Sequence, residues 1–155
     1  MATLHAAPND TYSLAWAALN PNYTQVTQAS VTNVATTQML GISNVTSALI
    51  LTPTYTGMVL FKIGGGVSVA ATDSWQLIPS YGTGAAPTNG HATQGTQVGT
   101  GAQGTMPTGP GTVPFWTEAI ITGLTLGTPV WFDLEAVFAA GTLVVSNIVA
   151  IAMEM

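Results

Sequence analysis

The chain has 155 residues, the size of one domain with a single hydrophobic core. Only 5% of its residues are Asp, Glu, Lys or Arg, against about 25% in typical soluble domains. Apart from two histidines, Lys62 is the only basic residue, and the net charge is -5. This balance excludes direct nucleic-acid binding, because the chain cannot neutralise phosphates, and it disfavours anionic membrane surfaces.

The apolar stretches are too short to span a membrane. The chain is 47% hydrophobic with a mean hydropathy of +0.43, yet its most apolar runs, at 48–51, 58–63 and 144–153, fall well below the roughly 20 residues of a spanning helix. The same hydrophobic content argues against a disordered chain. We therefore expect a folded protein that buries its apolar excess against other subunits.

The sequence gives no sign of export or of covalent cross-links. Residues 1–5 lack the basic and apolar regions of a signal peptide, so synthesis in a cytoplasm is expected. The absence of cysteine excludes disulfides, thiolate metal sites and cysteine nucleophiles.

Residues 1–40 are predicted to be an N-terminal arm or edge segment. Within them, residues 12–19 fit a helix or a strand equally well. Residues 24–38 alternate loosely between apolar and polar side chains and predict extended structure near a sheet edge or in an arm.

Residues 41–155 are predicted to form one β-sandwich domain. Segments 45–52 and 58–64 are expected to pair as a hairpin around a turn at 55–57. Three glycines at 64–66 then interrupt the second strand, which suits a bulge or a close backbone approach.

A strand is predicted at 75–81, and a Gly/Thr-rich loop follows at 82–112. This loop holds nine Gly, three Pro and eight Thr. A structureless loop of this length is uncommon inside a compact domain. We expect irregular strands within it, order imposed by neighbouring chains, or both.

The last third has the most regular pattern, with strands predicted at 113–121, 130–138 and 143–153. Period-two alternation in the middle strand places Asp133 and Glu135 on the same strand face. About eight strands at spacings of about ten residues indicate an all-β protein, an antiparallel β-sandwich of jelly-roll-like type.

Several blocks between residues 45 and 155 resemble a group of phage and prophage virion structural proteins. The most specific block is Tyr-Gly-Thr-Gly-x-x-Pro-x-Asn-Gly, which stands at 81–90 as YGTGAAPTNG. The other matching pieces are TP at 52–53, TGMVL at 56–60, GT at 95–96, ITGLTLGT at 121–128, WFDL at 131–134 and VSN at 145–147.

The resemblance implies a jelly-roll-like sandwich that assembles as a homotrimer and carries no catalytic residues. It also implies a place in the virion. The chain would be a decoration (cement) protein on the capsid surface, with the major capsid protein as its partner, or part of a fibre or spike.

No constellation in the sequence points to catalysis, a metal or a cofactor. His5 and His91 lack the spacing of a metal site or a triad. Asp133 and Glu135 could imitate a glycosidase pair, but a solvated strand face is the simpler interpretation, because no set of sugar-stacking aromatics surrounds them. Calcium bound by such carboxylates at a subunit interface stays an open alternative.

Lys62 lies in an apolar strand, where an unpaired buried charge would be costly, so it should point to solvent or pair with a carboxylate. Aromatic residues are expected in the core or at subunit contacts. The candidate assembly residues are Trp16, Tyr23, Lys62, Trp75, Tyr81, Trp116 and Trp131.

Two functions fit these observations, and neither is enzymatic. The preferred one is a bacteriophage capsid decoration protein that binds the outer capsid surface and stabilises the shell by mass action. The chain leaves little room for a fibre shaft, which favours this function. The alternative is a head-fibre, tail-fibre or spike tip whose loop 82–112 recognises host-surface glycans.

Overall fold

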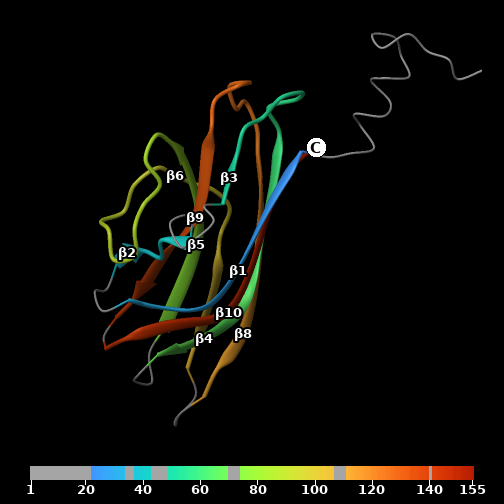
Figure 1. Ribbon diagram of the computed structural model, residues 1–155. Coiled ribbons are helices and arrows are strands. Elements are labelled where there is room, and N and C mark those ends of the chain that lie inside the picture. Colours follow the sequence, from blue (N-terminus) through green and yellow to red (C-terminus); the bar gives the residue numbers. More distant parts are fainter. Residues whose placement is uncertain (1–21, 34–36, 43–48, 70–73, 107–110, 140) are drawn as a thin grey trace, which may run out of the picture.

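The computed structural model describes residues 22–33, 37–42, 49–69, 74–106, 111–139 and 141–155 (Figure 1). Its regular elements are ten β-strands, and all strand pairs among them are antiparallel. The prediction of an all-β, antiparallel protein is confirmed. No helix within these ranges is long and apolar enough to cross a membrane.

Four long strands form the first sheet, which we call sheet A. Val, Ile and Phe at alternate positions give these strands one apolar side for the core. The strands predicted at 113–121 and 143–153 both belong to this sheet and are confirmed. In order across sheet A the strands are β1 (Tyr23–Asn33), β10 (Leu143–Glu154), β4 (Val59–Val69) and β8 (Val113–Ile121).

The second sheet, sheet B, is built on two long strands flanked by short ones. The long pair confirms the strands predicted at 130–138 and 75–81. Short edge strands offer little unpaired backbone to other chains, whereas sheet A has the long strands β1 and β8 at its edges. In sheet B, β2 (Thr37–Met39) and β3 (Ile50–Leu51) pair with one side of β9 (Val130–Phe138), β5 (Ser74–Thr83) pairs with the other, and β6 (Thr96–Gln97) and β7 (Ala102–Thr105) pair with β5.

The core lies between the two sheets (Figure 1). Phe61 of β4 and Phe132 of β9 meet across the layers with ring centroids 5.6 Å apart. Both are fully buried, as are Ile63 and Leu134, two residues further along the same strands. The sandwich is therefore confirmed as two packed antiparallel sheets. The jelly-roll topology and the homotrimer stay predictions.

The predicted hairpin between 45–52 and 58–64 is wrong. Ile50 and Leu51 form β3, which pairs with β9 in sheet B, whereas β4 lies in sheet A between β10 and β8. The chain therefore passes from one sheet to the other between β3 and β4. A turn signal of Pro and Gly fits such a crossing as well as a hairpin, and the long strands β10 and β8 offer β4 far more pairing than β3 could.

The three glycines at 64–66 lie inside β4 and do not interrupt it. The irregularity is on the neighbouring strand, where the register of β10 against β4 shifts between Ser146 and Val149. Asn147, at this bulge, has a positive φ of 51°. The bulge changes which side of β10 faces the core. Buried β10 residues are Leu143 and Val145 before it and Ile148, Ala150 and Ala152 after it.

The Gly/Thr-rich segment 82–112 contains the short strands β6 and β7, which confirms the expectation of irregular strands. The part between β5 and β6 also reaches β2, at the opposite edge of sheet B. The Met39 amide of β2 donates to the His91 carbonyl at 2.9 Å, and the Gly90 amide donates to the Met39 carbonyl at 3.1 Å. This segment therefore crosses the outer face of sheet B.

Candidate functional site

The outer face of sheet A is exposed in the part of the chain that the structure describes, and we call it the bare face. Core residues alternate with outward-pointing residues along each strand. The strand registers place the outward residues of β1, β10, β4 and β8 side by side in three rows. The rows are Tyr23, Met153, Leu60 and Ile120; Gln25, Ile151, Lys62 and Glu118; and Thr27, Val149, Gly64 and Trp116.

Large apolar side chains dominate the bare face. Tyr23, Trp116 and Ile120 are 62%, 57% and 56% exposed, and Val149 is 40% exposed. Single exposed apolar residues are ordinary on protein surfaces, but a contiguous group across four strands marks an interaction site. The bare face is therefore the strongest candidate for a functional surface.

One ion pair stands in the middle of this apolar surface. The Lys62 ammonium lies 2.9 Å from the Glu118 carboxylate on the neighbouring strand, and both side chains are well exposed. Lys62 thus meets both expectations, since it points outward and pairs with a carboxylate. An exposed pair adds only about 0 to 1 kcal/mol to stability. Its larger effect is to give the bare face one positive and one negative point.

Trp116 depends on the glycine opposite it. A side chain at Gly64 would collide with the Trp116 indole, which lies against the bare backbone of β4. Gly64 itself is buried by this contact. The glycine run in β4 therefore provides space for a large exposed aromatic ring, and it forms no phosphate-binding loop.

The outer face of sheet B contrasts with the bare face, because the chain covers it. Trp131 points outward from β9 but is only 2% exposed. Side chains at Gly82 or Gly95 would collide with its ring, and its indole N–H donates to the Thr83 carbonyl at 3.3 Å. The segment between β5 and β6 thus packs directly on Trp131.

Asp133, next on this covered face, is fully buried. Its carboxylate accepts hydrogen bonds from the backbone amides of Gly41 at 2.9 Å, Ile42 at 3.1 Å and Leu134 at 2.7 Å. Burial raises the pKa of Asp133 to about 7, although these three amides favour the ionised form. The side chain holds the residues after β2 against β9.

Glu135 lies on the same face as Asp133, as the alternation predicted. The prediction of a solvated strand face is wrong, because Glu135 is only 6% exposed and accepts a 2.7 Å hydrogen bond from the Gln97 side chain of β6. Local alternation could not reveal a cover made by residues 38 positions away. Both carboxylates join covering segments to the sheet. Within the described ranges, no three His, Asp or Glu side chains gather as they would around a metal ion.

Glu154, at the end of β10, is a structural residue that the sequence analysis missed. Its carboxylate accepts hydrogen bonds from the amides of Thr54, Tyr55 and Thr56 at 2.7 to 2.8 Å and from the Asn22 side chain at 3.1 Å. Burial would raise its pKa, but these hydrogen bonds lower it to about 2. Alternation with Ala150 and Ala152 was the available signal, since it places Glu154 on the buried side.

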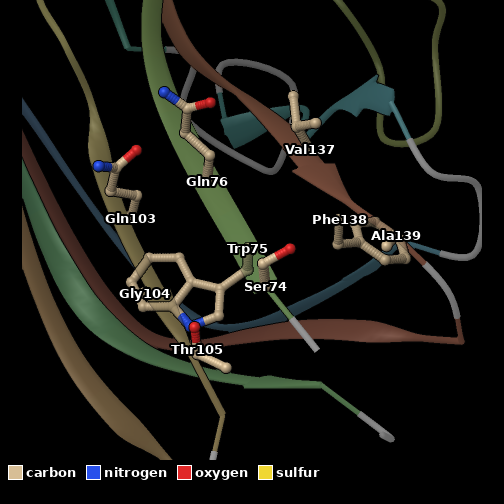
Figure 2. Close-up of a pocket in the computed structure, with 9 residues that line it drawn as sticks. All are labelled: Ser74, Trp75, Gln76, Gln103, Gly104, Thr105, Val137, Phe138 and Ala139. Carbon is tan, nitrogen blue, oxygen red and sulfur yellow. The ribbon is translucent and has the colours of Figure 1, made fainter. Parts of the chain in front are cut away.

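An open hollow of about 570 Å³ lies on sheet B where β5, β7 and β9 adjoin. Gln76 and Gln103 are paired across β5 and β7 and extend from neighbouring strands (Figure 2). None of the described residues that line the hollow is charged. Its lining residues are Ser74, Trp75, Gln76, Gln103, Gly104, Thr105, Val137, Phe138 and Ala139.

The structure brings three of the predicted assembly residues together: Tyr23, Lys62 and Trp116 share the bare face. Trp75 and Tyr81 instead pack in or against the core, and Trp131 is covered on sheet B. Trp16 lies outside the described residues. The aliphatic members of the bare face were missed, although alternation in 113–121 signalled Ile120. These are Leu60, Ile120, Val149, Ile151 and Met153.

No family model matches the sequence, and no curated protein matches it. Among solved structures, the chain is similar to the enzymatically active domain of tailspike protein 4 from bacteriophage CBA120. The TM-score is 0.32 and the identity 11%, over 83% of this chain and 19% of that chain. A TM-score of this size does not establish a common fold.

Proposed function

We propose that the chain is a structural subunit of a bacteriophage virion, a decoration (cement) protein on the outer capsid surface. In this proposal it assembles with copies of itself, as the homotrimer and jelly-roll-like fold that the sequence resemblance implies, and it binds the major capsid protein. Its action is to stabilise the shell by binding neighbouring capsid subunits in the assembled state only.

The observation that carries this proposal is the bare face. Four strands present apolar side chains to solvent around a single ion pair, and a surface of this kind gains free energy when another protein covers it. The low charge of the whole chain agrees with such a role, because charged residues are depleted in the centre of protein interfaces. The sequence resemblance supplies the virion as the setting.

Quantitative mass spectrometry of purified particles tests the proposal. A decoration protein should be present at hundreds of copies per particle and should be lost from particles when Ile120 or Trp116 is replaced by Ser. Gln103→Ser, on the outer face of sheet B, is the matched control and should be incorporated normally. A count of a few dozen or fewer copies would rule out the decoration role.

A fibre or spike tip that binds host glycans is the second candidate, and the hollow on sheet B favours it. Gln76, Gln103, Ser74 and Thr105 offer uncharged donors and acceptors, which suit a neutral sugar. Screening the protein against host-surface glycans tests this function. Gln76→Ala and Gln103→Ala should each abolish binding, while Gln25→Ala on the bare face should not, and the absence of binding to any glycan would contradict it.

A further inference from the structure

We propose that the β4–β8 part of the bare face is covered by the same part of a second copy of this chain, with Lys62 of each copy placed against Glu118 of the other. The proposal rests on the proposed function, because it names the partner of the same surface. Unlike the decoration role, this self-association can be tested on the purified protein alone.

The charge pattern of the bare face identifies the partner as a second copy. The face has one positive group, Lys62, and Glu118 is its partner in the same row on adjacent strands. A purely apolar partner would bury the Lys62–Glu118 pair without offering either group a further charged partner, at a cost in desolvation. A second copy of the same face offers each charge an opposite one, and Lys62 is the one basic side chain the sequence provides besides its two histidines.

The row arrangement allows this exchange in one geometry. A two-fold axis that runs along the strands, between β4 and β8, places β4 of each copy over β8 of the other. Because the rows run straight across these strands, each row then faces the same row with its two strands exchanged. Lys62 faces Glu118, Leu60 faces Ile120, and the two Trp116 rings lie near each other across the axis.

Other two-fold arrangements are less favourable. An axis across the strands at Lys62 would place the two lysines together, and like charges in an interface cost several kcal/mol. An axis between β10 and β4 would place Lys62 over Ile151 of the other copy, where that copy offers it no acidic partner. The charge pattern therefore selects the β4–β8 overlap, which leaves β1 and β10 outside the contact because β8 is the edge strand of sheet A.

Charge exchange between two variants tests the contact directly. The variants K62E and E118K each create a like-charged row, so each alone should self-associate at least about tenfold more weakly than the wild type. When the two are mixed in equal amounts, opposite charges face each other between copies, while each copy still has like charges within its own row. Association restored by mixing can therefore arise only from contact between copies.

The measurement is molar mass by light scattering over a range of protein concentrations. The wild type and the mixture should show twice the mass of either variant alone, whether the unit that pairs is a single chain or a homotrimer held by other surfaces. Gln103→Glu and Gln103→Lys place similar charge changes on sheet B and should keep the wild-type mass. Thermal unfolding of each variant checks that the fold is intact.

Three results would overturn the proposal: variants with the wild-type mass, a mixture no heavier than its components, or a wild type that does not pair at millimolar concentration. In the last case, protection of the bare face from hydrogen exchange would indicate residues 1–21 of the chain as the cover. Particles that contain the protein at high copy number would still support the decoration role, so the two proposals can fail separately.

Discussion

The outer faces of the two sheets each present a tryptophan, and the two rings differ sharply in exposure. On sheet B, Trp131 is 2% exposed beneath the segment that joins β5 to β6. On sheet A, Trp116 also points away from the core, but it is 57% exposed. Among the described residues, the chain thus covers Trp131 on one outer face and leaves Trp116 on the other largely exposed.

The difference teaches that a sandwich can gain a cover for an outer face in two ways. A long glycine-rich segment can fold back, because glycine lets backbone approach an aromatic ring closely, as at Gly95. Alternatively, another molecule can supply the cover, as we propose for the bare face. The first solution contributes to the stability of the monomer, and the second appears only on association.

Replacing the two tryptophans should give the largest contrast. Trp131→Ala removes a buried ring and should lower the free energy of unfolding by about 4 kcal/mol. Trp116→Ala removes an exposed ring and should cost less than about 1 kcal/mol. Urea denaturation followed by circular dichroism, at a concentration where the protein does not associate, measures both. Equal losses would mean that the two faces are packed alike.

The buried carboxylate of the covered face should make stability depend on pH. The pKa of Asp133 is raised from 3.8 to about 7 in the folded state, so its contribution is fully present below about pH 4 and is lost as the pH rises through 7. The free energy of unfolding should fall by about 2 to 3 kcal/mol between pH 5 and pH 7. Asp133→Asn should flatten this part of the profile. A wild-type profile without the decline would show that the three amides outweigh burial.

Glu154, buried where β10 ends, should contribute less to stability than Asp133, and its contribution should change with pH in the opposite direction. Glu154→Gln should lower the free energy of unfolding at pH 7 by about 2 kcal/mol, because several backbone amides lose a charged acceptor. With its pKa lowered to about 2, the carboxylate stabilises the fold above about pH 4.5, and this contribution is lost as the pH falls toward 2. Glu118→Gln on the bare face is the control and should change stability by no more than about 0.5 kcal/mol. Similar losses of stability in Glu154→Gln and Glu118→Gln would contradict the structural role of Glu154.

The smallest effect on the monomer is expected at Ile120. Ile120→Ser should change the free energy of unfolding by less than about 0.5 kcal/mol, since the side chain is 56% exposed, and should weaken self-association. The neighbouring residue Ile121 points into the core and is 2% exposed, so Ile121→Ser should unfold much of the protein at 37 °C. Thermal unfolding and light scattering compare the two. A large loss of stability at Ile120 would mean that the face is covered within one chain.

Much of the fold follows from local patterns in the sequence. Alternation over 113–121 and 130–138 predicted β8 and β9, because each strand has a core side with period two. The pairing of strands was not accessible in the same way, as the wrong hairpin before β4 shows. Pairing depends on contacts between distant residues, and a turn that contains Pro and Gly does not determine which sheet the next strand joins.

The candidate site was predictable only in part, for a related reason. The sequence indicated Tyr23, Lys62 and Trp116 as assembly residues, but it indicated Trp131 equally. All four alternate with core residues, so each points away from the core. Whether such a residue stays exposed depends on where the segment between β5 and β6 lies, which no local pattern specifies.

The bulge at Asn147 has a consequence for the bare face. The extra residue shifts the alternation of inward and outward side chains along β10, so that odd-numbered residues face the core before it and even-numbered ones after it. A β10 that ran straight through Asn147, without the bulge, would keep one continuous alternation. Val149, Ile151 and Met153 would then take the places of the buried residues, and Ile148 and the small Ala150 and Ala152 would take theirs on the outer surface. One asparagine thus decides which of two interleaved sets of side chains the protein offers to its surroundings.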